Sequence, residues 1–465
     1  VSPLSRGGVL LDSKQRLRFA IGRDDDLELR AAYRKHPDSD WTTFENPLEG
    51  EAIPLAIAGD DRTVYVSSDA NDRMGVHAFD LETGEVEPLV THKLVEANSM
   101  LWSRDGDELV GVEFLPGLPQ VLFVDEPHED RGTWESLLAT FDGMHVRVTS
   151  TTSDNNVAIV ATFSDLQPPT WYHYDIANGK LQYLVSARPQ INPEAMAPTE
   201  SYWLTARDGL DFQAYVTRPV DAGDKPLPTI MYIHGGPHGP RDEWAYQPET
   251  QMLANRGYVV IQPNYRGSGG FGEFFEETGY RKWYGEMQDD ITDATLWAIE
   301  QGIADEDRIC IYGASYGGYA TLAGLTKEPD LYACGFAFVG VYDLELMYEY
   351  GDIPERKMGR NFLEDAIGRD EAELKARSPI NHVANIKAPL YVAHGEQDIR
   401  AHVEHFYHVR DRLNKENIPF EQLLVPKEGH GFYKFENRVN YANELLGFFD
   451  RHIGTPTTSD SVASN

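Results

Sequence analysis

Ser315 lies in a short motif whose residue types could create a nucleophile. Residues 313–317 read Gly-Ala-Ser-Tyr-Gly, and an apolar run at 308–312 precedes them. Glycines on both sides of a serine permit a sharp turn from a strand into a helix, which pushes the serine oxygen out of the sheet edge. The N-terminus of the helix then stabilises negative charge that develops nearby. The motif predicts a nucleophilic Ser315, and the alternative is a glycine-rich turn in which the serine only caps the helix.

A serine nucleophile needs a base and an acid, and the chain offers both downstream. Asp398 follows a short apolar run that reads as a strand, and His430 lies between glycines after the last predicted strand. His430 would accept the proton of Ser315 and return it to the leaving group, while Asp398 would hold the imidazole in the right tautomer. The order serine, acid, histidine is that of the α/β-hydrolase fold. Glu396 is the alternative acid, and we favour Asp398.

A glycine pair in the run His-Gly-Gly-Pro-His at 234–238 could form an oxyanion hole. The backbone N–H of Gly236, together with that of Tyr316 beside the nucleophile, would point at the negatively charged oxygen of a tetrahedral intermediate. The alternative is a tight turn without a role in the chemistry. His234 and His238 could suggest a metal site, but a third ligand at zinc-like spacing is missing, so we expect no metal and no cofactor.

A glycine-rich run at 264–272 could be mistaken for a phosphate-binding loop. It lacks the Gly-Lys-Ser/Thr ending of that motif, and no helix-opening Gly-x-Gly-x-x-Gly fits. We therefore expect a structured loop near the site, in which Arg266 pairs with a carboxylate such as Asp289 or Asp290.

Short strands separated by turns fill residues 1–190. The segments 76–90 and 172–185 share one pattern, which is a strand, an aspartate, a glycine-containing turn and a second strand. These and the other strand clusters repeat every ~40–50 residues, the period of a β-propeller blade. We expect an all-β, β-propeller-like domain of about four blades. An irregular β-sandwich is the alternative.

Strands alternate with amphipathic helices after a proline-containing linker at 186–198. This alternation predicts an α/β-hydrolase domain over residues 191–453, with a mostly parallel sheet and helices on both of its faces. The Thr-, Ser- and Asp-rich end, residues 454–465, is expected to be a disordered tail.

Composition limits the partners of the chain. Of its 465 residues 41 are basic and 75 acidic, a formal charge of −34, which excludes binding to nucleic acid or anionic lipid through bulk charge. This charge favours solubility, and adaptation to salt is the alternative. The sequence contains no run of about 18 apolar residues, the length that would predict a membrane span. Cys310 and Cys334 lie in apolar runs and are predicted to be buried free thiols.

Together these motifs resemble those of the prolyl oligopeptidase family of serine peptidases, in its acylaminoacyl-peptidase and dipeptidyl-peptidase-like bacterial branch. The motifs are His-Gly-Gly-Pro (234–237), Asn-Tyr-Arg-Gly-Ser (264–268), Gly-Ala-Ser-Tyr-Gly-Gly-Tyr (313–319), His-Gly-Glu-Gln-Asp (394–398) and Glu-Gly-His-Gly-Phe (428–432). The resemblance implies a β-propeller that caps an α/β-hydrolase domain and limits substrates to oligopeptides. It implies that the nucleophile is Ser315, the acid Asp398, the base His430, and the oxyanion donors Gly236 and Tyr316.

The resemblance also locates a substrate pocket. Val341, Leu344 and Met347 follow the strand after the nucleophile helix, and Arg400 follows the acid. Together with Tyr316, the three apolar residues would suit a hydrophobic or proline-like side chain, and the alternative is that they are simple core residues. Two departures from the family pattern are present. The tyrosine hydroxyl that some relatives place in the oxyanion hole is replaced by His234 or a glycine, and the Val-Pro that often follows Arg400 is absent.

We expect a serine peptidase that hydrolyses short peptides through an acyl-enzyme on Ser315. A carboxylesterase with the same triad is one alternative, and a propeller-based binding protein with an inactive hydrolase domain is another. The blade-rich N-terminal region favours peptides over esters, and the intact triad argues against an inactive domain. The sequence assigns neither the compartment nor the preferred residue.

The predicted propeller is incomplete. The family's hydrolase domain sits over a wider ring than four blades make, and an open arc would expose apolar blade faces. We expect the sequence to be the carboxyl-terminal portion of a longer polypeptide, with the ring completed by a second chain or by a subunit contact.

Overall fold

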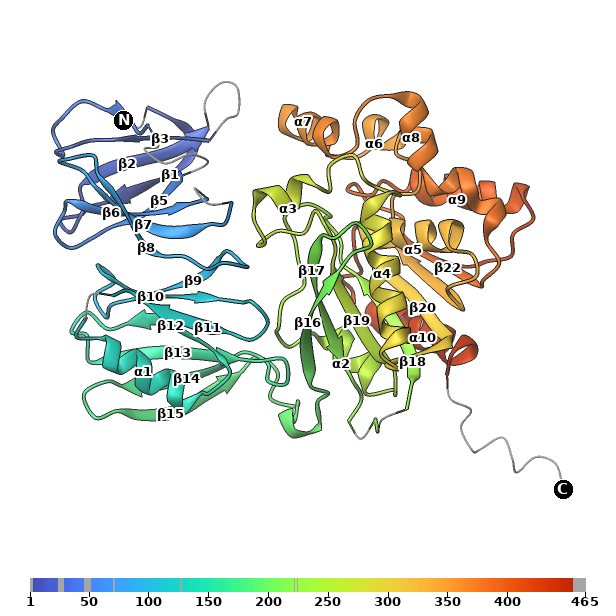
Figure 1. Ribbon diagram of the computed structural model, residues 1–465, viewed down its shortest axis with the longest axis horizontal. Coiled ribbons are helices and arrows are strands. Elements are labelled where there is room, and N and C mark those ends of the chain that lie inside the picture. The colour runs from blue at the N-terminus through green and yellow to red at the C-terminus, as the bar shows by residue number, and fades with distance from the viewer. Residues whose placement is uncertain are drawn as a thin grey trace. The chain divides into compact units, whose positions relative to one another are not determined.

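The structure is a computed structural model that divides into two compact units (Figure 1). It describes residues 3–23, 29–45, 52–69, 72–125, 128–220, 222–223 and 225–454. The first unit comprises Val1–Glu194 with the short segments Trp244–Tyr246 and Gly270–Phe274, and the second comprises the rest of the chain. Except for Gly454, the predicted tail lies outside the described residues.

Four antiparallel sheets follow one another along the first unit, drawn in blue to green in Figure 1. The first sheet contains β1 (Ser5–Leu11), β2 (Leu17–Arg23), β3 (Leu29–Tyr33) and β4 (Thr42–Thr43), and the second β5 (Ala52–Ile57), β6 (Thr63–Ser68), β7 (Gly75–Asp80) and β8 (Val86–Val90). The third contains β9 (Ala97–Trp102), β10 (Leu109–Phe114) and β11 (Gln120–Phe123), and the fourth β12 (His145–Thr151), β13 (Val157–Phe163), β14 (Thr170–Asp175) and β15 (Lys180–Ser186). These are blade-like sheets, as the repeat predicts.

An aspartate closes each of the two hairpins that share a sequence pattern. Asp80 Oδ1, at the end of β7, accepts hydrogen bonds from the backbone N–H groups of Glu82 at 2.7 Å and Thr83 at 3.0 Å. Asp175 Oδ1, at the end of β14, accepts from the N–H of Asn178 at 3.1 Å. The carboxylate satisfies turn amides that the strand ladder leaves unpaired, which explains why aspartate precedes both turns.

Helix α1 (Arg131–Thr140) joins the third sheet to the fourth, where the sequence analysis expected only strands and turns. Trp134 and Leu137 are its buried residues, and they pack with Val160 in the core of the fourth sheet. Two buried positions are too few to give a helical period that can be recognised in the sequence.

The second unit is built on one eight-stranded sheet. Its strands lie in the order β16 (Thr199–Thr205), β17 (Asp211–Thr217), β19 (Val259–Asn264), β18 (Leu227–Ile233), β20 (Ala304–Ala314), β21 (Cys334–Phe338), β22 (Leu390–Gly395) and β23 (Glu421–Val425). The pairs β16–β17 and β17–β19 are antiparallel, and every later pair is parallel. Because parallel strands end at the same edge, the loops after β18, β20, β22 and β23 meet there.

Helices cover both faces of this sheet, as predicted for an α/β-hydrolase domain. The helices are α2 (Pro248–Ala254), α3 (Glu273–Glu277), α4 (Glu286–Glu300), α5 (Tyr316–Lys327), α6 (Leu346–Glu349), α7 (Lys357–Ala366), α8 (Glu371–Arg377), α9 (Glu404–Lys415) and α10 (Phe435–His452). On β20, Tyr312 packs in one core cluster with Leu253 of α2 and Phe449 of α10. Ile311, which points to the opposite face, contacts the α5 side at Gly324. No helix among the described residues combines the length and apolarity of a membrane span.

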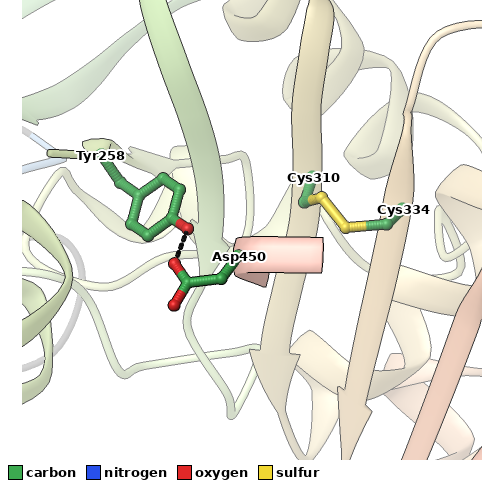
Figure 2. Close-up of a disulfide and its surroundings, with 4 residues drawn as sticks. All are labelled: Tyr258, Cys310, Cys334 and Asp450. Atoms are coloured by element: carbon green, nitrogen blue, oxygen red, sulfur yellow. Dashed lines mark hydrogen bonds between the residues drawn. A yellow bond between two sulfur atoms is a disulfide. The ribbon is translucent and has the colours of Figure 1, made fainter. Parts of the chain in front are cut away.

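The prediction of two free thiols was wrong. Cys310 on β20 and Cys334 on β21 are partners in the parallel register, their Cα atoms lie 4.6 Å apart, and they form a disulfide (Figure 2). The apolar surroundings that suggested buried thiols are present, since both residues are fully buried. Strand register decides which residues face each other across a sheet, and register cannot be read from the two apolar runs taken separately.

Candidate active site

Ser315 lies at a strained turn between β20 and α5. Its φ is 60° and its ψ is −118°, a combination that residues with a Cβ rarely adopt. Its backbone N–H donates to the carbonyl oxygen of Phe338 at 3.0 Å, which ties the turn to β21. A Cβ on Gly313 or Gly317 would overlap the carbonyl oxygen of Ile233 at the end of β18. The turn can therefore form only because both flanking positions are glycine, and it presents the serine at the carboxyl edge of the sheet.

Asp398 lies in the loop after β22 and is 1% exposed. Its Oδ2 accepts a hydrogen bond from His430 Nδ1 at 2.8 Å, and its Oδ1 accepts from the backbone N–H groups of Arg400 at 2.8 Å and Ala401 at 3.0 Å. Because the carboxylate accepts at Nδ1, the proton of a neutral His430 is on Nδ1 and Nε2 is free to accept another. Glu396, the alternative acid, is exposed.

The loops that carry Asp398 and His430 are joined through their backbones. The N–H of Gln397 donates to the carbonyl oxygen of Glu428 at 2.8 Å. The Glu428 side chain is buried and accepts hydrogen bonds from the N–H of Tyr433 at 2.8 Å, the N–H of Lys434 at 3.1 Å and Asn437 Nδ2 at 2.6 Å. This carboxylate fixes the chain after His430 to the start of α10. Sequence reasoning missed its role, although its place in the Glu-Gly-His-Gly motif was a signal.

His394 is a second residue that sequence reasoning missed. It is fully buried at the end of β22, and its Nε2 lies 2.8 Å from the carbonyl oxygen of Ala401 and 3.5 Å from Asp398 Oδ2. A carbonyl oxygen only accepts, so Nε2 carries the proton and closes the loop that holds Asp398. Burial lowers the pKa of His394 to about 4, so the ring is neutral at neutral pH.

One cavity of 870 Å³ brings most of the predicted site residues together. Those that line it are Gly236, Ser315, Tyr316, Val341, Met347, Arg400 and His430. Asp398 lies behind His430, hydrogen-bonded to it, and does not line the cavity. Leu344 is fully buried and is also not among the lining residues.

The glycine pair after β18 lies directly beside Ser315. A Cβ on Gly235 would be 3.2 Å from Ser315 Cβ, and Gly236 lines the cavity next to it with a φ of 125°. His234 turns away into the fold, because its ring stacks on Tyr265 with 4.4 Å between centroids and its Nε2 lies 2.9 Å from Ser268 Oγ. Within the described ranges, no group of three His, Cys, Asp or Glu side chains could hold a metal ion.

Arg266 forms the carboxylate pair that the sequence predicts. It donates to both oxygens of Asp290, at 2.8 and 2.7 Å, and also to both oxygens of Asp208, at 2.7 and 3.0 Å. Asp289, the other expected partner, instead pairs with Lys327 at 2.7 Å. Arg266 thus ties the turn between β16 and β17 to α4, which is a structural role.

Comparisons with known proteins agree with this architecture. Residues 244–456 match the family model of the prolyl oligopeptidase family. Dipeptidyl aminopeptidase BIII of Pseudoxanthomonas mexicana is 31% identical over 459 residues, which cover 93% of this chain and 66% of that protein. Dipeptidyl peptidase family member 6 of Caenorhabditis elegans is 27% identical, over 95% of this chain and 66% of that protein. The chain thus spans just under two thirds of the length of these two curated relatives.

Solved structures share the fold. The puromycin-hydrolyzing peptidase of Mycobacterium tuberculosis superposes with a TM-score of 0.75 at 22% identity, over 94% of this chain and 68% of that one. The acylaminoacyl peptidase of Pyrococcus horikoshii superposes with a TM-score of 0.69 at 19% identity, over 95% and 70%. The structures share the fold, and the family rests on the sequence comparisons. The match of residues 244–456 to the family model and the 31% identity to a dipeptidyl aminopeptidase show that the chain belongs to the prolyl oligopeptidase family.

Proposed function

We propose that this chain is a serine peptidase that hydrolyses short peptides through an acyl-enzyme on Ser315. The observation that carries the proposal is the hydrogen bond of 2.8 Å from His430 Nδ1 to Asp398 Oδ2, because His430 also lines one cavity with Ser315. The relatives named dipeptidyl aminopeptidase and acylaminoacyl peptidase support peptides as the substrate class.

In the proposed reaction, Ser315 Oγ attacks the carbonyl carbon of the scissile bond while His430 Nε2 takes its proton. Asp398 holds the ring and stabilises the imidazolium, and the N–H groups of Gly236 and Tyr316 donate to the oxyanion. When the C–N bond breaks, His430 returns the proton to the leaving amine. Water then attacks the ester on Ser315 by the same steps and releases the acid.

The acyl side of the substrate would occupy the apolar part of the cavity. Val341 and Met347, which the sequence analysis selected, line it together with Trp283, Phe362 and Met358. Two of these are methionines, whose unbranched side chains adapt to ligands of different shape. We propose a large hydrophobic side chain at this position, with Leu344 supporting the wall from behind.

Arg400 lies at the polar part of the same cavity. Its guanidinium donates to Asp352 Oδ2 at 2.8 Å, and both residues line the cavity. The arginine keeps further N–H donors for a carbonyl of the substrate main chain. We therefore propose that Arg400 orients the peptide rather than selects its side chains.

We further propose two functional domains, a blade-like domain over 1–190 and a catalytic domain over 191–453, with the blade-like domain restricting substrates to short peptides. A further chain or subunit would complete the ring of blades. Exposed apolar side chains on the outer strands β1 and β15 support this, namely Val9, Leu11, Tyr183, Leu184 and Val185, which are between 41% and 55% exposed.

A panel of chromogenic substrates tests the proposed activity. It compares X-Pro, acyl-alanyl and free-amine dipeptidyl amides with simple esters, with the Ser315→Ala chain as control. We expect turnover of at least one peptide amide, labelling of the wild-type chain by a fluorophosphonate, and loss of both in Ser315→Ala. Hydrolysis of esters alone would make the chain a carboxylesterase, and turnover by the alanine variant would contradict the serine mechanism.

A further inference from the structure

Tyr433 is an aromatic residue that the fold exposes at the edge of the active-site cavity. It lies three residues after His430, its exposed fraction is 75%, and it lines the cavity. Phe435, at the start of α10, is similarly exposed at 73% but is not a lining residue. Exposed aromatic side chains contribute little to a core, so an exposed ring at a cavity wall suggests contact with a ligand.

The backbone of Tyr433 is held by its neighbours in the loop. Its backbone N–H donates to Glu428 Oε2 at 2.8 Å, and that carboxylate also accepts from Asn437. A Cβ on Gly429 would lie 3.8 Å from Cε2 of the Tyr433 ring, an ordinary van der Waals distance. The Tyr433 ring therefore lies close to the backbone immediately before His430.

The proposed reaction decides which part of a substrate reaches this wall. Ser315 Oγ bonds to the acyl carbon, the C–N bond breaks, and His430 delivers the proton to the leaving nitrogen. The leaving amine must therefore lie on the His430 side of the cavity, whereas the acyl side chain occupies the pocket with Val341 and Met347.

We propose that Tyr433 forms a leaving-group subsite that binds an aromatic or other large apolar residue on the amine side of the scissile bond. The inference rests on the proposed acyl-transfer function. An aromatic ring stacked on Tyr433 would be held beside the proton donor, which lowers the entropic cost of protonating the leaving nitrogen. A glycine at the same place gains nothing from the ring.

The test uses two peptide substrates with the same acyl part and different leaving groups, phenylalaninamide and glycinamide. We expect the wild-type chain to show a higher kcat/KM for the aromatic leaving group, and Tyr433→Ala to reduce that preference by about 5- to 10-fold. Tyr433→Phe keeps the ring and should keep the preference. Phe435→Ala is the matched control, because it removes an equally exposed aromatic that does not line the cavity, and it should also keep the preference.

Two results would overturn the subsite. One is an unchanged preference in Tyr433→Ala, and the other is an equal loss for both leaving groups, which would mean that the ring only shapes the His430 loop. A second measurement separates failure of the subsite from failure of the peptidase proposal. The acyl-enzyme is formed from an ester, and its partition between water, phenylalaninamide and glycinamide is measured. If the chain cleaves esters but not peptides, the proposed function fails. The subsite is still supported in that case if Tyr433→Ala loses the preference of the acyl-enzyme for phenylalaninamide over glycinamide.

Discussion

Each of the two units buries a carboxylate against a histidine, and the pair in the blade unit is entirely enclosed. Glu113 on β10 is 1% exposed and lies 3.0 Å from His145 Nδ1. Arg147 donates to both of its oxygens, at 2.8 and 2.5 Å, so the carboxylate has a permanent cation. The other nitrogen of His145, Nε2, lies 3.0 Å from the carbonyl oxygen of Trp244. Both ring nitrogens of His145 are therefore hydrogen-bonded within the protein.

The pair in the hydrolase unit has the same contact but opposite surroundings. His430 Nδ1 lies 2.8 Å from Asp398, its side chain is 28% exposed, and it lines a cavity together with Ser315. No arginine or lysine among the described residues forms an ion pair with Asp398, whose other hydrogen bonds come from backbone N–H groups. The comparison teaches that a histidine–carboxylate contact alone does not indicate catalysis. What matters is whether the second ring nitrogen is left for a substrate.

Replacement of the two histidines should therefore have opposite effects. We expect His430→Gln to lower kcat by about 10⁶-fold, because the members of a triad act as a unit, while the melting temperature stays close to that of the wild type. His145→Gln should lower the melting temperature and leave the kcat of the folded chain nearly unchanged. Peptide hydrolysis and thermal unfolding of both variants give the answer. If both variants lost turnover equally, the His430 pair could not be distinguished from the His145 pair as the one that acts in catalysis.

Replacement of the two carboxylates, Asp398 and Glu113, should separate the two pairs in the same way. Asp398→Asn should lower kcat by about 10⁴-fold, because an amide in place of the carboxylate favours the wrong tautomer of His430. Glu113→Gln should instead lower the free energy of unfolding by about 3 kcal/mol, because Arg147 loses its partner in a largely buried pair. Urea unfolding and kcat, measured on both variants, separate the two losses. A fall in kcat for Glu113→Gln at full stability would show that the blade pair takes part in turnover.

The pH dependence of stability should also reveal the Glu113 pair. Burial opposes ionisation of Glu113, but the hydrogen bonds from Arg147 and His145 outweigh burial and lower its pKa from 4.5 to about 2. The unfolded chain thus binds this proton more tightly than the folded chain, so stability from this group is complete above pH 4.5 and is lost as the pH falls towards 2. The shift corresponds to about 3 kcal/mol. In unfolding experiments between pH 6 and 3, the stability difference between wild type and Glu113→Gln should shrink as the pH falls. A constant difference would contradict the assigned cause.

The sequence can single out the catalytic candidates because their signals are local. The turn at Ser315 needs glycine at two neighbouring positions for a steric reason, and both Asp398 and His430 directly follow strands that can be recognised by their apolar residues. Because parallel strands end at one edge, recognising the strands is enough to bring the three loops together.

The remaining features depend on contacts between distant segments. The Cys310–Cys334 disulfide requires the register of β20 with β21, and the Glu113 pair requires β10 and β12 of two different sheets to meet. The exclusion of Leu344 from the cavity depends on which way a short segment turns after β21. None of these follows from composition or from a repeat, because side-chain direction is decided by packing.

Replacement of His394 tests whether Asp398, the proposed catalytic acid, is positioned by N–H groups alone, in contrast to Glu113, which has an arginine. Its Nε2–H closes the loop at Ala401, whose own N–H donates to Asp398 at 3.0 Å. His394→Leu removes that donor, and we expect kcat to fall by about 10- to 100-fold with little change in KM, because Asp398 loses its fixed position. His394→Gln can place an amide N–H where Nε2 was and should recover most of the activity. His405→Gln is the control, because His405 is equally buried but does not contact Asp398, so it should lower only the melting temperature. If His394→Leu and His405→Gln lose the same activity, or if glutamine fails to rescue a folded chain, His394 has no positioning role.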